Sequence, residues 1–179
     1  HFEGEIEHYD LTIGVTFSDL DLAEKFVDSL KKIAAQWPHR MRLVACLHKI
    51  SPSEIDSIFQ KANLTTLELI IYDENSATEL ANAGGLGPWF LNETYRTGVS
   101  WGRCVLHRRI LDEIRNDNRP LIWILDEDMQ LHLCNSSDPN CKGFDAFLQT
   151  VWYMEKFGID VGIGHVIGDP PIHPLFTMR

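Results

Sequence analysis

The chain has little of what marks several special classes of protein. Its longest uninterrupted apolar stretches, residues 43–47 and 121–125, are far shorter than the roughly 20 residues that a transmembrane helix needs. Basic residues are also scarce, since 16 Lys and Arg stand against 26 Asp and Glu and give a formal net charge of −10. Acidic proteins repel the phosphates of nucleic acids. We therefore expect no transmembrane segment and no nucleic-acid partner.

Cysteine is sparse as well, with four residues among 179, which is too few for a disulfide scaffold. Residues 1–10 are polar and form a leader or edge segment without a visible secretory signal. We therefore expect a cytoplasmic protein with reduced thiols. Cys46 and Cys104 stand among apolar residues, which predicts that both are buried, while a disulfide between Cys134 and Cys141 is sterically possible.

Two nucleotide-binding fingerprints are also missing from the sequence. No Gly-x4-Gly-Lys-Ser/Thr segment is present, which excludes a P-loop enzyme. No Gly-x-Gly-x-x-Gly segment follows the first predicted strand, which excludes the dinucleotide-binding fingerprint.

Apolar and polar residues instead alternate in a way that is typical of an α/β protein. The pattern predicts strands over residues 11–17, 41–48, 67–72, 121–125 and 160–167. It predicts helices over residues 22–36, from Ser51 onward with a capping box, over 99–115 and over about 144–157, and leaves 73–97 irregular. The nearly continuous apolar strands favour a mostly parallel sheet covered on both faces, within a single domain over residues 11–179.

Three acidic residues, Asp126-Glu127-Asp128, directly follow the most hydrophobic of these strands. Ligands of open α/β sheets bind at the carboxyl ends of the strands. Residues two apart in an extended chain point to the same side, so Asp126 and Asp128 can converge on one ion. Their hard oxygen atoms suit Mg²⁺ or Mn²⁺. The alternative is that the three acids end the strand and cap the segment that follows.

A second signal opens the helix before that strand, where residues 98–103 read Gly-Val-Ser-Trp-Gly-Arg. The two signals together resemble nucleotide-sugar-dependent glycosyltransferases of the GT-A fold, in particular the inverting, family-2-like transferases. These proteins show Gly-x-Ser-x-x-Arg-Asn at a helix start, then a hydrophobic strand, then Asp-x-Asp. The resemblance covers about residues 11–129, and it departs from the family pattern at Cys104, where the family has Asn.

The resemblance implies a three-layer α/β sandwich that binds a nucleoside diphosphate sugar together with Mn²⁺ or Mg²⁺. Asp128 would be the direct metal ligand, with Asp126 on the metal and near the ribose or sugar. Arg103 would lie near the donor sugar or phosphate, unless it is a surface residue that pairs with a nearby acid. Thr16 and Phe17, at the end of the first strand, would form a wall of the nucleotide pocket.

The resemblance also assigns residues at the ends of the other strands. His48 takes the place where family members often have a base-reading Asp, which leaves the nucleobase open. Asp73, with Glu74, would contact the base or ribose, or would cap a turn.

Inverting transfer also needs a general base to deprotonate the acceptor. Asp169 is the late acid in a suitable loop, with His165 and His173 as other candidates, but each of the three also has an ordinary turn or surface role. The chain is short for the family at the acceptor end, and the acceptor is unidentified.

Two other functions remain open at this stage. A nucleotide-sugar-binding module without turnover would account for the weakly marked base region. A nucleotidyltransferase of related topology would use the same acids to hold a metal, but the Gly-rich, basic loop that cradles a triphosphate does not follow the first strand.

Overall fold

The computed structural model describes residues 8–35, 37–83, 99–129 and 143–160. Strands and helices alternate along them, as the sequence predicts. The elements are β1 (Asp10–Phe17), α1 (Leu20–Ala34), β2 (Met41–Leu47), α2 (Pro52–Ala62), β3 (Leu67–Tyr72), α3 (Glu74–Asn82), α4 (Val99–Glu113), β4 (Pro120–Asp126) and α5 (Gly143–Phe157).

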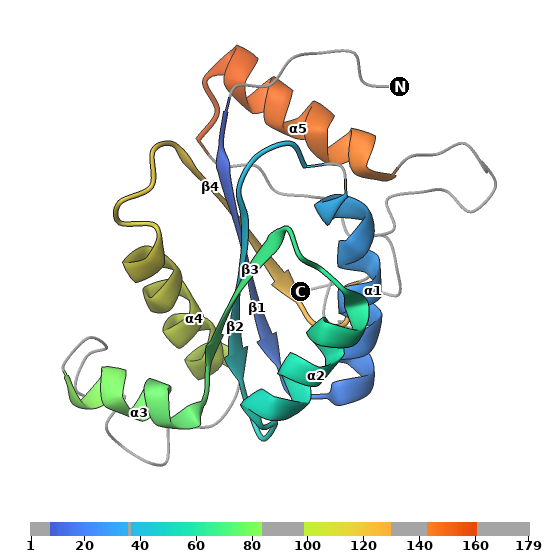
Figure 1. Cartoon of the computed structure of the whole chain (residues 1–179). Coiled ribbons are helices and arrows are strands. Elements are labelled where there is room, and N and C mark those ends of the chain that lie inside the picture. The colour runs from blue at the N-terminus through green and yellow to red at the C-terminus, as the bar shows by residue number, and fades with distance from the viewer. Residues whose placement is uncertain (1–7, 36, 84–98, 130–142, 161–179) are drawn as a thin grey trace, which may run out of the picture.

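The four strands form one sheet in the order β3-β2-β1-β4, and every neighbouring pair is parallel. Helices α1 and α2 cover one face of this sheet and α4 covers the other, so the described part of the chain is a helix–sheet–helix sandwich (Figure 1). Helix α5 lies across the end of the sheet at which the strands begin (Figure 1). The predicted α/β class and the parallel sheet are therefore confirmed.

The sequence places clear start signals at the first two helices. Asp19 caps α1, because its carboxylate accepts a hydrogen bond from the Leu22 amide at 3.0 Å. Ser51 and Glu54 form the predicted capping box at the start of α2, and Pro52 occupies the first turn. These caps fix where each chain segment leaves the strand ends and enters a helix.

The alternation of side chains along β1 divides the core into two parts. Ile13, Val15 and Phe17 are fully buried in the larger cluster with α1 and α2. Gly14 faces α4, and a Cβ atom at this position would lie only 2.4 Å from the Ile110 Cδ1 atom. The missing side chain therefore lets α4 pack closely against the centre of the sheet.

Ion pairs close the sheet where β2 and β3 begin, a region that we call the amino edge. Arg42 donates to Asp117 over 2.8 Å, and only 4% and 5% of these two side chains are exposed. Arg42 also donates to the Glu113 carbonyl oxygen at 3.2 Å. Beside them Arg40 binds Glu68 at 2.7 Å, and this hydrogen bond lowers the pKa of Glu68. The guanidinium of Arg42 thus sits in a pocket of acceptors that is closed to solvent.

Two predictions about local structure are wrong. The stretch taken as irregular after Tyr72 begins with helix α3, which Asp73 caps. Cys104 is exposed, because the buried side of α4 carries Val105 and Leu106 instead, while Cys46 is buried as predicted. Burial raises the pKa of the Cys46 thiol to about 12.

The prediction that both faces of every strand are covered also fails, at β4. Ile122 and Ile124 are 41% and 40% exposed, because β4 is an edge strand of the described sheet and α4 packs over β1 and β2 instead. The predicted strand over 160–167, apart from Asp160, and the cysteines at 134 and 141 lie outside the described residues. No helix in the described part of the chain combines the length and apolar character needed to cross a bilayer.

Candidate functional site

The parallel register brings the ends of β1 and β4 together, although Ser18 and Glu127, the residues just beyond these ends, are 109 residues apart in the chain. Thr16 of β1 pairs with Asp126 of β4. Arg103, in the first half of α4, donates a hydrogen bond to the Asp126 carboxylate. Three of the residues predicted to bind the donor are therefore brought together at one end of the sheet, which we call the carboxyl edge.

A close approach between α4 and β1 shapes this part of the carboxyl edge. A Cβ atom on Gly102 would lie 3.5 Å from the Thr16 Cγ2 atom and 3.8 Å from its hydroxyl oxygen. That hydroxyl is buried and has no hydrogen-bond partner within the described ranges. Buried polar atoms rarely stay without a partner. The Thr16 hydroxyl is thus an unused donor and acceptor beside Arg103 and Asp126.

The three acidic residues at the end of β4, of which Asp126 is the last residue of the strand, lie in a turn closed by the Met129 amide donating to the Asp126 carbonyl oxygen at 3.1 Å. The Glu127 carboxylate reaches back to the turn between β1 and α1. It accepts hydrogen bonds from the amides of Ser18, at 2.6 Å, and Asp19, at 3.1 Å, and from the Ser18 hydroxyl. The sequence patterns gave Glu127 no role, because its partners lie so far away in the chain.

The acidic turn offers a limited set of metal ligands. Within the described ranges, no group of three or more His, Cys, Asp or Glu residues is placed to hold a metal ion. Two carboxylates nevertheless fit Mg²⁺ or Mn²⁺, because Mg²⁺ sites commonly use one or two carboxylates and fill the other positions with water and phosphate oxygens. Asp126 and Asp128 have the right chemistry for an ion that is shared with a bound phosphate.

The residues predicted at the ends of β2 and β3 lie on the other side of β1. His48 Nδ1 lies 2.9 Å from the Glu74 carboxylate, and the Lys49 amide donates to the same oxygen at 3.1 Å. Asp73 accepts hydrogen bonds from the amide and hydroxyl of Ser76 at 2.8 and 2.9 Å, which lower its pKa. Its carboxylate therefore caps α3, the second of the two roles considered for it.

The Phe17 side chain lies in the hydrophobic core and does not form a wall of the predicted nucleotide pocket. Its side chain is fully buried and packs edge to face against Phe26, with ring centroids 5.5 Å apart. Its carbonyl oxygen accepts a hydrogen bond from the His48 amide at 2.9 Å. The side chain thus belongs to the core, and it supports the strand end from beneath.

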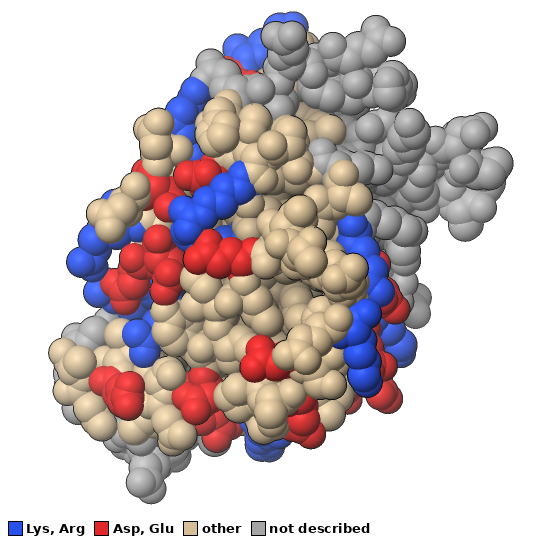
Figure 2. Space-filling view, in the orientation of Figure 1, with Lys and Arg blue, Asp and Glu red and all other residues tan. Residues whose placement is uncertain are grey.

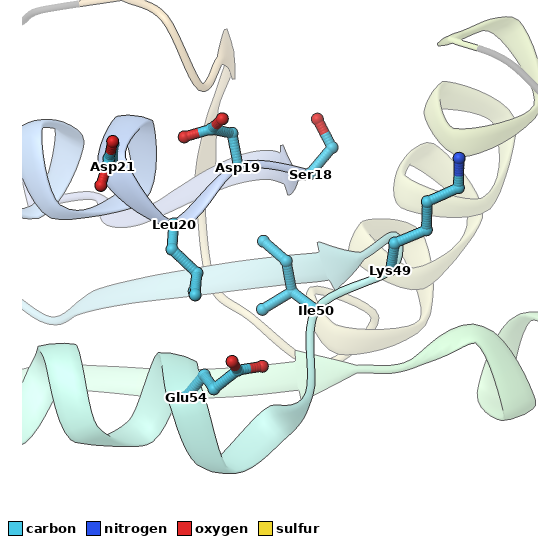
Figure 3. Close-up of a pocket in the computed structure, with 7 residues that line it drawn as sticks. All are labelled: Ser18, Asp19, Leu20, Asp21, Lys49, Ile50 and Glu54. Atoms are coloured by element: carbon cyan, nitrogen blue, oxygen red, sulfur yellow. The ribbon is translucent and has the colours of Figure 1, made fainter.

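A shallow depression of about 340 Å³ opens at the carboxyl edge between the start of α1 and the start of α2 (Figure 3). Its lining residues are Ser18, Asp19, Leu20, Asp21, Lys49, Ile50 and Glu54. The lining carries three carboxylates and one amine, so it is acidic overall. On the wider surface, Figure 2 shows acidic and basic side chains interspersed, with no continuous basic area among the described residues of that face.

Several main-chain amides around this depression donate hydrogen bonds to carboxylates of the protein. The Asp19 carboxylate accepts a hydrogen bond from the Leu22 amide, and the Glu54 carboxylate accepts one from the Ser51 amide. The Glu127 carboxylate accepts from the amides of Ser18 and Asp19. A helix N-terminus with free amides would attract phosphate directly. Here the carboxylates reduce the number of amides that an incoming anion can use, which favours side-chain cations or a bound metal ion.

Lys49 can supply a positively charged side chain to an anion at the depression, and no sequence pattern identified this residue. Its side chain lines the depression, and its amine extends away from Ile50 in Figure 3. No ion pair joins this amine to another residue of the described ranges. A basic residue directly after a strand of a parallel sheet is the signal that could have identified it.

The chain matches no protein-family model, no curated protein and no solved structure in the comparisons made with known proteins. The case for a function therefore depends on the geometry of the carboxyl edge. The predicted base Asp169 and the motif residue Gly98 lie outside the described residues.

Proposed function

We propose that this protein is a metal-dependent glycosyltransferase of GT-A type. It would move a sugar from a nucleoside diphosphate donor to an unidentified acceptor with inversion, using Mn²⁺ or Mg²⁺. The observation that carries the proposal is the contact between Arg103 and Asp126 at the end of β4, next to the end of β1. It joins the two motifs that the sequence shows separately.

The described side chains suit a diphosphate bound through cations. Arg103 is about half exposed, and its guanidinium can hold a phosphate with two parallel hydrogen bonds once a ligand competes for it. Lys49 offers a second positive charge beside the depression. Asp126 and Asp128 would hold the metal ion, which when bound would stabilise the negative charge of the departing nucleoside diphosphate as a Lewis acid.

The occupied amides favour metal-dependent binding over the direct binding of phosphate to main-chain nitrogen atoms. Three carboxylates accept hydrogen bonds from four amides at the starts of α1 and α2, those of Ser18, Asp19, Leu22 and Ser51. The acidic depression beside them would repel a diphosphate that carried no cation. This arrangement also disfavours a nucleotidyltransferase, whose chemistry uses a basic, amide-rich loop to cradle a triphosphate.

Calorimetric titration with UDP, GDP, CDP and TDP, with and without Mn²⁺, tests the proposal. We expect one of them to bind only when Mn²⁺ is present, and Asp128→Asn to weaken that binding at least about tenfold, the loss of about 1.4 kcal/mol. Asp56→Asn, which neutralises an exposed acid of α2, is the matched control and should leave the affinity unchanged. No metal-linked binding to any of the four would count decisively against the proposal.

Product analysis separates transfer from the two other functions. Release of the nucleoside diphosphate from its sugar donor, lost in Asp128→Asn, identifies a transferase. Metal-linked binding without any release identifies a binding module. Release of pyrophosphate from a nucleoside triphosphate identifies a nucleotidyltransferase.

A further inference from the structure

We propose that Glu127 is a positioning residue for the predicted metal ligand Asp128. This inference rests on the proposed function and deepens it. The Glu127 carboxylate ties the acidic turn after β4 to the turn between β1 and α1 through three hydrogen bonds, from the amides of Ser18 and Asp19 and from the Ser18 hydroxyl. These hydrogen bonds thereby fix the position of the neighbouring Asp128 carboxylate.

The physical setting makes this tie strong for a surface contact. The acceptor is charged, and hydrogen bonds to charged groups are shorter and stronger than those between neutral groups. Two of the donors are main-chain amides directly before α1, where the aligned peptide dipoles favour a negative charge. Because amides of the main chain cannot rotate away, the tie fixes the backbone of both turns.

Asp126 and Asp128 differ in how their side chains are held. Asp126 belongs to β4, pairs with Thr16 across the sheet and binds Arg103. The exposed Asp128 side chain makes no hydrogen bond or ion pair with any other described residue. Its position therefore depends on the backbone of the turn, which the Met129–Asp126 hydrogen bond and the Glu127 tie hold in place. Loss of the Glu127 hydrogen bonds should therefore shift Asp128 and weaken binding of the metal ion.

Two substitutions at Glu127 separate geometry from charge. In Glu127→Gln the amide oxygen can accept from both main-chain amides and the amide nitrogen can donate to the Ser18 hydroxyl, so the tie persists without the charge. Glu127→Ala removes the tie and the charge together. The probe is Mn²⁺ with whichever of UDP, GDP, CDP and TDP binds wild type best, measured by calorimetry.

We expect Glu127→Gln to bind within about threefold of wild type and Glu127→Ala to bind about tenfold more weakly. Ser18→Ala, which removes one of the three hydrogen bonds and leaves all carboxylates in place, should weaken binding about threefold. This milder variant keeps the test decisive if Glu127→Ala does not fold. The amide proton resonances of Ser18 and Asp19 should stay near their wild-type positions in Glu127→Gln and move in Glu127→Ala.

Equal affinity of wild type, Glu127→Ala and Ser18→Ala would overturn the inference and would leave the proposed function unaffected. Equal losses in Glu127→Gln and Glu127→Ala would also overturn it, because the charge rather than the tie would then matter. Absence of metal-linked binding in wild type would overturn the proposed function and this inference together.

Discussion

The two ends of the sheet use the same kinds of charged residue in opposite ways. At the amino edge, Arg42 and Asp117 are 4% and 5% exposed and form a direct ion pair. At the carboxyl edge, Arg103 and Asp126 are 47% and 45% exposed and form an equally direct pair in solvent. A buried pair becomes costly when either partner is lost, whereas an exposed pair is easily exchanged. The amino edge is thus built for stability, whereas the proposed function assigns binding to the carboxyl edge.

The largest expected effect comes from breaking the buried pair. Arg42→Met should lower the free energy of unfolding by about 3 kcal/mol, because it leaves the buried Asp117 carboxylate with only its longer contact to Arg40, at 3.4 Å. Urea unfolding measures the loss. Affinity for the nucleoside diphosphate should not change in the protein that remains folded.

The double variant Arg42→Met/Asp117→Leu is the control for this experiment. It removes both charges, so it should recover most of the stability that the single change loses. If Arg42→Met lowered the free energy of unfolding by less than about 1 kcal/mol, the ion pair at the amino edge would not be more important for stability than the pair at the carboxyl edge.

The exposed pair should behave in the opposite way. Arg103→Ala should weaken metal-linked binding of the nucleoside diphosphate about 10- to 100-fold, because it removes a charged donor to phosphate. The free energy of unfolding should change by less than about 0.5 kcal/mol. Arg115→Ala, which removes an exposed ion pair with Asp112, is the matched control. Unchanged binding in Arg103→Ala would reduce this residue to a surface partner of Asp126.

A smaller effect should separate the two roles considered for Asp73. Asp73→Ala should cost about 1 kcal/mol of stability at pH 7, because α3 loses its cap. The hydrogen bonds from Ser76 hold the folded-state pKa of Asp73 below its ordinary value of 3.8. Its contribution is therefore complete above that value and fades as the pH falls through the lower folded-state pKa. Urea unfolding at pH 7 and pH 3 should show the difference between wild type and variant shrinking in acid.

Asp73→Asn keeps a good capping group and should retain most of the stability at pH 7. Neither variant should alter the affinity for the nucleoside diphosphate, because the carboxylate is engaged by Ser76. A clear loss of affinity would return Asp73 to the donor-binding residues.

Much of the fold follows from local sequence signals. The strands around Leu43 and Ile70 contain apolar runs, the strand around Ile13 alternates apolar residues with Thr and Gly, and the capping box at Ser51 marks the start of α2 without ambiguity. Helix α3 escaped prediction because it is only nine residues long and contains two Asn, a Ser and a Thr, which are weak helix formers. The exposure of Ile122 and Ile124 depends on where β4 lies in the sheet, which no local pattern records.

The site was predictable only in part, because its contacts also depend on which strands lie next to each other in the sheet. Asp126, Asp128 and Arg103 stand in recognisable motifs, so the sequence could propose them and the structure brings Arg103 and Asp126 into contact. The partnership of Glu127 with Ser18 is a contact across the sheet, set by which strands become neighbours. Sequence patterns identify residue types at strand ends, whereas the packing of whole elements decides which of those ends meet.

The pairing of β1 with β4 also orders the events of folding. The neighbouring pairs β1–β2 and β2–β3 need only short crossovers through one helix, but Ser18 and Glu127 are 109 residues apart in the chain. Closing so long a segment costs more chain entropy than the short crossovers do, and such contacts tend to form late. We therefore expect the contact between the ends of β1 and β4 to form late in folding, after the layer that supports it, so that binding of the proposed ligand would report completion of this step.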